Sequence, residues 1–356
     1  MTLLQKIADN QLTGRGGACF PVAKKWLLVE SGLSAKIQNS NEKVILYLVA
    51  NGSEGEPGVK KDFYLLDKYP ESVISGIKET MSYFRGRFGR NIDVRSIVYL
   101  NHDYFTRFRR QLQKLIEADN IKLFQKPNEA GYIGGEETAL LNVLEGRRAE
   151  PRLKPPFPAE SGLWGMPTLV QNIETFYHIS RIASDQYLKT RFYTVGGDCF
   201  APGVYEFSED ITINEVLSKT GNHPLKMPFE KSRYDFFVQV GGDASGEVFD
   251  STQLNQPVAG AGSITVYSKA KHRSSDLIAK WVEFFKNESC GQCTPCREGS
   301  VRVAELLKVE KPNWKIINEI FDVMSETSFC ALGASIPVAV RSYLANVHNN
   351  DVVSDD

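Results

Sequence analysis

The sequence predicts an α/β protein in three parts: a doubly wound α/β layer, a small β domain and a C-terminal helical bundle. Apolar strands alternate with amphipathic helices through the first half of the chain, as in a doubly wound layer. Short β segments broken by glycine pairs follow, and helical spacing of apolar residues returns near the C-terminus. A chain of 356 residues, 42% of them hydrophobic, is long enough to form two or three cores.

The α/β layer begins with a strand over residues 44–50, a continuous apolar run typical of a strand buried on both faces. Pro70 lies at the start of a helix whose apolar residues recur at helical spacing. A strand over residues 97–100, a helix over 104–118 and a short strand over 121–124 continue the alternation. Sheets of this kind bind ligands at the carboxyl ends of their strands.

The later elements follow a proline-rich stretch. Five prolines between residues 151 and 167 predict a stiff, irregular loop. The small β domain is predicted over residues 191–268, with strands near residues 192–195, 203–207, 236–240 and 263–266. A helix is then expected after Ser275 as N-cap, and a stripe of apolar residues from Ile316 predicts another.

Two glycine-rich segments form candidate ligand loops. Residues 13–21 lead into a helix near Lys24, which places unhindered backbone amides at the positive end of a helix dipole. This outlines a phosphate cradle, although a tight structural loop explains the same glycines. Residues 51–58 follow the first strand, where glycines let the backbone approach a flat ligand and carboxylates can accept hydroxyl hydrogens. The alternative for this second segment is an exposed acidic turn.

A third segment, residues 131–140, places Glu136 and Glu137 in the first turn of a helix. The helix dipole favours negative charge there, and helix capping alone explains the two carboxylates. Turns and capping explain each segment separately, but they do not explain why all three occur in order.

Four cysteines near the C-terminus predict an iron–sulfur site. Cys290, Cys293 and Cys296 lie at three-residue spacing, and Cys330 lies in a separate loop. Three thiolates of a short loop can hold one side of a [4Fe-4S] cluster while a distant fourth completes it. Structural zinc, the alternative, prefers paired Cys-x-x-Cys knuckles. Disulfides are not expected, because residues 1–10 lack the apolar core of a signal peptide and the compartment is therefore taken as reducing.

Charge and hydropathy exclude other classes of protein. The formal net charge is -1, which gives no bias toward nucleic acid. No apolar run approaches the roughly 18 residues of a membrane span. We therefore expect no nucleic-acid partner, no direct membrane insertion and a cytoplasmic location, with any membrane attachment made through a partner.

The three segments belong to a set of five ordered motifs, at residues 14–21, 51–58, 131–140, 151–158 and 288–299. This set resembles the NADH-oxidising FMN flavoprotein subunit of respiratory complex I. The same subunit type recurs in NAD-linked hydrogenases, formate dehydrogenases and electron-bifurcating complexes.

The resemblance implies three domains. A Rossmann-like domain over residues 1–188 would bind FMN and NADH. A β-grasp domain of the soluble-ligand-binding type would cover residues 189–270, and a helical [4Fe-4S] domain residues 271–356.

The resemblance also implies site residues by position. The residues expected to bind FMN are Gly14, Arg15, Gly16, Lys25, Asn51, Ser53, Glu54, Gly135, Glu136 and Asn172. Those expected to contact NADH are Phe20, Glu56, Tyr132, Glu137 and Phe157. The cluster ligands are Cys290, Cys293, Cys296 and Cys330.

The implied activity is that of an NADH dehydrogenase module, reversible in principle. NADH gives two electrons as hydride and an iron–sulfur cluster takes one, so a flavin has to connect them. No side chain is expected to act as a nucleophile or general base; Glu54 is expected to tune the flavin, and an acidic Glu137 near a ribose to disfavour NADPH. The implied partners are a small thioredoxin-like [2Fe-2S] subunit and a larger iron–sulfur subunit, while quinone, protons, ferredoxin and carbon dioxide all remain open as the final acceptor.

Several positions differ from the family's pattern. Ser53 replaces an aspartate, Cys19 and Gly134 replace a glycine and a cysteine, and Gln171 replaces an asparagine. These changes lie at the nucleotide and flavin sites, while all four cluster ligands are kept. They support an alternative, a non-catalytic electron relay or scaffold subunit with a degenerate nucleotide and flavin site.

Overall fold

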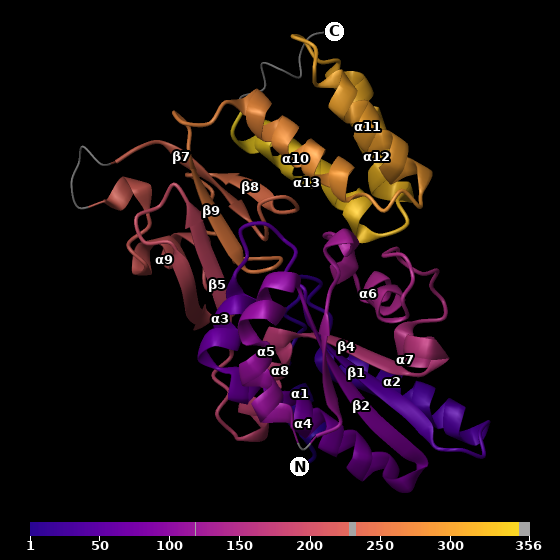
Figure 1. Cartoon of the computed structure of the whole chain (residues 1–356). Coiled ribbons are helices and arrows are strands. Elements are labelled where there is room, and N and C mark those ends of the chain that lie inside the picture. Colours follow the sequence, from indigo (N-terminus) through magenta and orange to yellow (C-terminus); the bar gives the residue numbers. More distant parts are fainter. Residues whose placement is uncertain (118, 228–232, 349–356) are drawn as a thin grey trace. The chain divides into compact units, whose positions relative to one another are not determined.

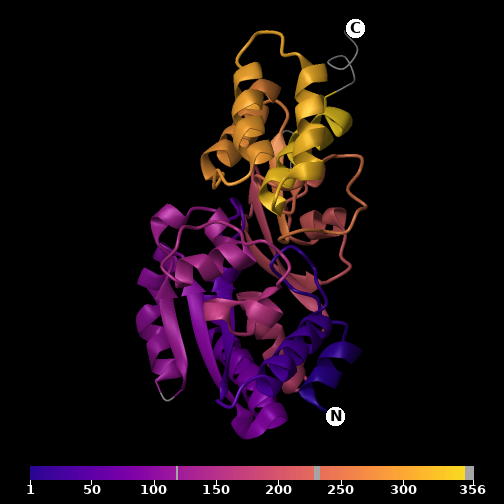
Figure 2. The ribbon, with the colours of Figure 1, turned by 90° about the vertical axis from the view of Figure 1, so that its right-hand side faces the viewer.

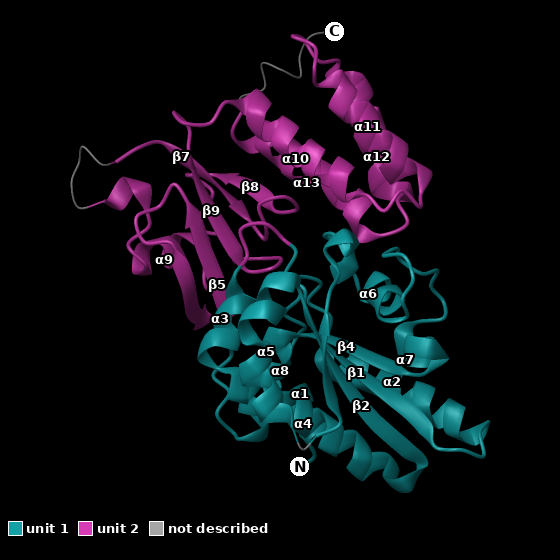
Figure 3. Cartoon of the chain, viewed as in Figure 1, with its two compact units in different colours: residues 1–55, 60–191 teal, residues 56–59, 192–356 magenta. Residues whose placement is uncertain are grey.

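The computed structural model describes residues 1–117, 119–227 and 233–348, and Figure 1 shows its helices and strands along the chain. The chain forms two compact units, coloured separately in Figure 3: residues 1–55 with 60–191, and residues 56–59 with 192–356. The second unit therefore contains the late β segments, the C-terminal helices and one short piece from the N-terminal half. The three-domain division stays a prediction.

The first unit is built on a parallel sheet. Its strands are β1 (Val44–Gly52), β2 (Ile92–Leu100), β3 (Ile121–Gln125) and β4 (Thr168–Asn172). All three pairings are parallel, in the order β3-β2-β1-β4. The later strands β2 and β3 extend the sheet on one side of β1, whereas β4 pairs on the other side. The order thus switches between β1 and β4, and such a switch opens a crevice at the carboxyl ends of the strands.

Helices and short helical turns connect these strands. They are α1 (Leu3–Asp9), α2 (Val22–Gln38), α3 (Lys61–Lys68), α4 (Pro70–Phe88), η1 (Gly89–Asn91), α5 (His102–Ile116), η2 (Asn128–Ala130), η3 (Ile133–Gly135), α6 (Glu137–Leu144), α7 (Pro158–Ser161), η4 (Leu163–Gly165) and α8 (Ile173–Ala183). Tyr47 and Val49 of β1 and Tyr99 of β2 pack with Leu140 and Leu141 of α6 in one buried cluster. Helices α4 and α8 pack against each other and against the sheet.

The predicted boundaries in this unit need correction. The second strand starts at Ile92 rather than at residue 97, because its first part alternates between buried and exposed residues instead of forming an apolar run. The helix predicted over 104–118 begins at His102, where the Asn101 side chain caps it by accepting the Tyr104 amide at 2.9 Å. Residue 118, its predicted end, lies outside the described residues.

Two parts of the first unit have a different secondary structure from the one predicted. The proline-rich stretch contains α7 and η4, and has cis peptide bonds before Pro155 and Pro156. Strand β4 was not predicted, because five residues after a proline carry no periodic signal of their own.

The second unit has a mixed sheet with strands β5 (Thr190–Gly197), β6 (Gly203–Ser208), β7 (Phe236–Val240), β8 (Glu247–Asp250) and β9 (Ser263–Ser268). The strand order is β6-β5-β9-β7-β8; β5 runs parallel to β9, and β7 runs antiparallel to β8 and β9. Helix α9 (Ile213–Lys219) buries Ile213, Val216 and Leu217 in the core of this sheet, and the turn η5 (Pro224–Lys226) follows it.

The unit ends in helices α10 (Ser274–Glu288), α11 (Thr294–Leu306), α12 (Trp314–Thr327) and α13 (Ala331–Asn346), which Figure 2 shows as one group. The predicted N-cap Ser275 is wrong. Helix α10 starts at Ser274 with Arg273 as N-cap, and the Ser275 hydroxyl donates to Asp276 instead of capping an amide. The predicted fold class is confirmed: a parallel α/β layer, a small β-sheet and a C-terminal group of helices.

Candidate functional site

The candidate site of the first unit lies at the carboxyl edge of the sheet, at the switch between β1 and β4. Asn51 pairs in register with Asn172, which caps α8 by accepting the Glu174 amide at 3.0 Å. The first glycine loop reaches the same place. A Cβ on Gly16 would lie 3.5 Å from the Cβ of Asn172, and the Arg15 amide donates to Thr175 Oγ1 at 3.0 Å. The structure thus brings together residues that are far apart in sequence.

The glycine loop itself is held by Arg15 and by a turn. The Arg15 guanidinium is buried and donates to Thr13 Oγ1 at 3.1 Å and to Tyr187 Oη at 3.0 Å. Gly14 donates its amide to the Phe20 carbonyl at 2.9 Å. Cys19 has a φ of 51°, a left-handed conformation that glycine adopts at least cost.

Asn51, Ser53 and Gly135 form a second contact group. The Asn51 side chain donates to the Gly135 carbonyl at 2.9 Å and accepts the Ser53 hydroxyl at 2.8 Å and the Ser53 amide at 3.2 Å. A Cβ on Gly135 would lie 2.6 Å from Ser53 Oγ. The two segments therefore approach so closely that a side chain at residue 135 would displace Ser53.

The acidic helix start is confirmed as a capping site. Glu136 is the N-cap of α6 and accepts the amides of Thr138 at 2.8 Å and Ala139 at 2.9 Å. Although burial opposes it, hydrogen bonds from the Thr138 hydroxyl and the Ala139 amide, together with the Lys154 ammonium, lower the pKa of Glu136. Glu137 pairs instead with the Lys25 ammonium, which also donates to the Val170 carbonyl at 2.7 Å.

Glu54 lies where β1 leads into α3. Its carboxylate accepts the amides of Asp62 at 2.7 Å and Phe63 at 3.2 Å, and the hydroxyl of Tyr104. The side chain of Lys60, the N-cap residue of α3, accepts no hydrogen bond from the helix. Glu54 therefore caps α3 by accepting hydrogen bonds from its first amides. Burial, and then the charge of Asp62, raise the pKa of Glu54 to about 7.

This raised pKa predicts a pH-dependent stability. The ordinary value is 4.5, so the folded chain holds the Glu54 proton more tightly than the unfolded chain does. Protonated Glu54 therefore contributes to the free energy of unfolding in full below pH 4.5, and this contribution is lost as the pH rises toward about 7. Between pH 5 and pH 8, the free energy of unfolding should therefore fall by about 2 kcal/mol more in the unmodified chain than in Glu54→Gln. Urea unfolding at the two pH values measures this difference. The same pH difference in both proteins would contradict this assignment.

The residues expected to contact NADH come from several segments and from both units. Phe20 and Phe157 expose 41% and 52% of their surface, and the Lys24 ammonium lies over the Phe20 ring, 5.7 Å from its centre. Tyr132 packs beside Gly55, where an added Cβ would lie 3.3 Å from its ring. Glu56 belongs to the second unit, and its carboxylate accepts the Ala244 amide at 3.0 Å and the Ser245 amide at 3.1 Å.

Sequence reasoning missed three charged residues beneath the site: Lys61, Asp62 and Glu174 are all buried. Lys61 is the first residue of α3, and Glu174 lies in the first turn of α8. A signal for the second helix was available, because Asn172 precedes an amphipathic run and asparagine is a preferred N-cap. No local pattern indicates that Lys61 is buried.

The four cysteines lie in the helical part of the second unit, with Cys290 in the loop between α10 and α11. Cys293 is the N-cap of α11, Cys296 is buried in its first turn, and Cys330 is the N-cap of α13. The start of α13 lies against Cys296, because a Cβ on Gly333 would be 2.9 Å from the Cys296 Cβ.

Burial raises the pKa of the Cys296 thiol to about 11, and the nearby thiols of Cys293, Cys330 and Cys290 contribute in the same direction. Three further thiols near Cys296 suit a cluster that takes four thiolates. Among residues 1–117, 119–227 and 233–348, no three His, Cys, Asp or Glu side chains are arranged to share a single metal ion.

Within the part of the chain that the structure describes, no helix combines the length and apolar character needed to cross a membrane.

Two family models match the chain in the expected places. The Nuo51 FMN-binding domain matches residues 7–181, which lie in the first unit except for residues 56–59. The NADH-ubiquinone oxidoreductase-F iron-sulfur binding region matches residues 276–350 and includes all four cysteines.

Curated relatives carry related names. The chain is 30% identical to the F subunit of NADH-quinone oxidoreductase from Aquifex aeolicus, over 96% of this chain and 83% of the relative. The corresponding protein of Streptomyces coelicolor is 32% identical, over 93% and 78%. The alpha subunit of the NAD-reducing hydrogenase HoxS from Cupriavidus necator is 31% identical over 96% of this chain, which spans 58% of that protein.

A solved structure agrees with these relatives. The crystal structure of NAD+-reducing [NiFe]-hydrogenase in the H2-reduced state superposes with a TM-score of 0.82 and 26% identity, over 99% of this chain and 62% of the solved chain. The family inferred from the five motifs is thereby confirmed. The chain belongs to the family of the NADH-quinone oxidoreductase F subunits, with its FMN-binding region over residues 7–181 and its iron–sulfur binding region over residues 276–350.

Proposed function

We propose that this chain oxidises NADH with bound FMN, reversibly in principle, and passes single electrons through a [4Fe-4S] cluster to partner iron–sulfur subunits. The observation that carries the proposal is the convergence at the switch point. Gly16, Asn51, Gly135 and Asn172 come from four separate segments and meet at the edge where an open α/β sheet binds its ligand.

The residues at this edge fit FMN. Gly16 of the first loop and the N-terminus of α8 can offer a backbone amide and a positive helix end to a phosphate, whereas the Gly14 amide is donated to the Phe20 carbonyl. Asn51 uses one amide hydrogen on Gly135, so its contacts with described residues leave the other for a ligand. Ser53 and Glu54 continue the same edge with a hydroxyl and a carboxyl group. When bound, FMN would convert the electron pair of a hydride into single electrons for the cluster.

NADH would approach the exposed aromatic faces. Phe20 and Phe157 can stack on planar rings, and Tyr132 and Glu137 lie on the segment that leads into α6. Glu56 is assigned to the nucleotide by the family resemblance alone; in the structure its carboxylate accepts the Ala244 amide, the Ser245 amide and the Ser245 hydroxyl.

Glu137 sets the preference between NADH and NADPH in this proposal. We expect Glu137→Gln to lower the ratio of kcat/KM for NADH to kcat/KM for NADPH about tenfold. The variant no longer repels the 2′-phosphate of NADPH, and it leaves the Lys25 ammonium without its carboxylate partner. The measurement is kcat/KM for both nucleotides. Glu129→Gln, an exposed site in the preceding turn, is the matched control. An unchanged ratio in Glu137→Gln would remove this residue from nucleotide selection.

The cluster and the partners complete the proposal. Cys290, Cys293, Cys296 and Cys330 would supply the four thiolates of the [4Fe-4S] cluster. The relatives are named as subunits, so we propose a hetero-oligomer with a small thioredoxin-like [2Fe-2S] subunit and a larger iron–sulfur subunit. We place the chain in the cytoplasm, with any attachment to a membrane complex made through these partners.

The alternative, a relay or scaffold subunit with a degenerate flavin site, is not favoured. The FMN-binding family model matches across the segments that carry Cys19, Ser53 and Gln171. The test is the FMN released from purified protein, together with NADH-driven reduction of ferricyanide. About one FMN per chain and NADH-dependent turnover support the proposal. Protein that keeps its iron but releases no FMN and shows no turnover would establish the relay.

A further inference from the structure

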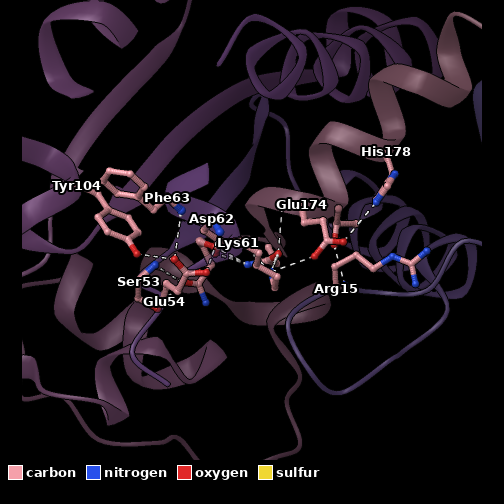
Figure 4. A network of polar contacts seen from close by, with 12 residues as sticks. Arg15, Ser53, Glu54, Lys61, Asp62, Phe63, Tyr104, Glu174 and His178 are labelled. Atoms are coloured by element: carbon pink, nitrogen blue, oxygen red, sulfur yellow. Dashed lines mark hydrogen bonds and ion pairs between the residues drawn. The ribbon is translucent and has the colours of Figure 1, made fainter. Parts of the chain in front are cut away.

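Lys61 lies at the centre of a buried polar cluster under the candidate flavin edge. Its ammonium nitrogen is 2.8 Å from Asp62 Oδ1, 2.9 Å from Asn172 Oδ1 and 3.1 Å from Glu174 Oε2. The side chains of Lys61, Asp62 and Glu174 expose 3%, 2% and 0% of their surface. Figure 4 shows Lys61 between the Glu54–Asp62 pair and Glu174.

The contacts and the burial of Lys61 keep its ammonium away from a ligand. The ammonium donates to Asp62 Oδ1 and Asn172 Oδ1 and forms an ion pair with Glu174. Because only 3% of the Lys61 side chain is exposed, it offers almost no surface to a phosphate or a flavin atom. A lysine of this kind acts on a ligand only through the groups that it holds.

Asn172 is the group through which Lys61 would act. Its amide donates to the Asn51 carbonyl at 3.2 Å and to Asp62 Oδ2 at 2.7 Å. Its oxygen accepts Lys61 and the Glu174 amide, so all four hydrogen-bonding positions of the side chain are used. Asn172 thus ties β1, α3 and α8 together at the switch point, and its Cβ supports the close approach of Gly16.

The charges around Lys61 explain why the cluster depends on it. Although burial opposes it, Asp62 and Glu174 raise the pKa of Lys61, and Lys61 in turn lowers the pKa of Glu174. His178 and Arg191 also face Glu174, while Glu54 and Tyr104 lie on the Asp62 side. Without the ammonium, two buried carboxylates would lose their nearest cation, and uncompensated buried charge is strongly unfavourable.

We infer that Lys61 is a positioning residue of the flavin site: it holds Asn172 and the first turns of α3 and α8 in the arrangement that receives FMN, and it does not touch the ligand. The inference rests on the proposed function, because it assigns a role toward the FMN that this edge is proposed to bind. The glycine loop and Asn51 contact the ligand directly in that proposal, whereas Lys61 shapes the edge from beneath.

The test is the dissociation constant of FMN from protein stripped of flavin, measured by fluorescence quenching at pH 6 and pH 8. We expect Lys61→Met to weaken FMN binding at least about tenfold at pH 8 and less at pH 6, where protonation relieves the carboxylates that have lost their cation. Lys60→Met, an exposed neighbour at the same helix start, should bind within about twofold of the unmodified chain. A purely structural role would lower the melting temperature without this pH-dependent loss of affinity.

A double variant keeps the inference testable if Lys61→Met does not fold. Lys61→Met with Glu174→Gln removes one charge of each sign, so it should fold and should recover part of the affinity at pH 8. It should still bind FMN more weakly than the unmodified chain, because Asn172 has lost a donor. FMN binding equal to that of the unmodified chain at both pH values, in either variant, would overturn the inference. An unmodified chain that binds no FMN would instead defeat the proposed function.

Discussion

Gly76→Ala is expected to destabilise the first unit by about 3 kcal/mol, because α4 and α8 touch through their backbones at this residue. A Cβ on Gly76 would lie 1.8 Å from the Phe176 carbonyl oxygen and 2.6 Å from its carbon. Neither atom can move without the rest of α8, so the two helices would have to separate. Asn172, Glu174 and Thr175 belong to the start of α8, so this separation should also weaken FMN binding. Urea unfolding and FMN titration measure the two effects.

Gly86 provides a matched control in the same helix. A Cβ there meets no atom within 4 Å. Gly86→Ala should therefore stabilise the unit by about 0.5 to 1 kcal/mol, since alanine is the better helix former. Opposite signs for the two glycines are the expected result. Similar small effects would show that α4 and α8 are not in backbone contact at Gly76.

Cys330→Ser is the second substitution with a large expected effect. Cys330 is the proposed cluster ligand farthest along the chain, and it would join the start of α13 to the loop before α11 through the cluster. Removing one of four thiolates should cut bound iron from about four atoms per chain to less than about one. FMN content should stay near that of the unmodified protein, because the flavin segments lie in the other unit.

The control for this substitution is Cys199→Ser. Cys199 packs against the core of the mixed sheet in the same unit, so it tests the loss of a thiol apart from cluster binding. Its iron content should match that of the unmodified chain. Full iron content and an unchanged visible spectrum in Cys330→Ser would exclude Cys330 as a ligand.

Local patterns in the sequence were enough for the elements that lie around the site. The apolar run of β1 predicted a strand buried on both faces, and Pro70 correctly marked the first turn of α4. The acidic start of α6 was confirmed at Glu136. These features depend on residues that are close together in the chain. The order of the five motifs along the chain then indicated the family.

The features that local patterns could not predict depend on contacts between distant segments. Strand β4 is short, and its importance comes from pairing with β1 across the switch point. The burial of Lys61 and Asp62 follows from the docking of α8 beside them, which no spacing within residues 51–62 encodes.

The segment 51–58 shows the same limit. It reads as one acidic, glycine-rich loop, but its two glutamates belong to different units. Glu54 caps α3 in the first unit, whereas Glu56 binds the Ala244 and Ser245 amides in the second. The family resemblance assigns both residues to the bound cofactors by position alone. The structure adds a capping role for Glu54 and a turn-binding role for Glu56.

The measurement that tests the central claim most directly is an anaerobic titration of the purified chain with NADH, following flavin and iron–sulfur absorbance together after the FMN content has been determined. The account predicts stoichiometric FMN whose absorbance bleaches with NADH, accompanied by reduction of the cluster. Intact cluster absorbance without FMN, or bound FMN that NADH does not bleach, would contradict it.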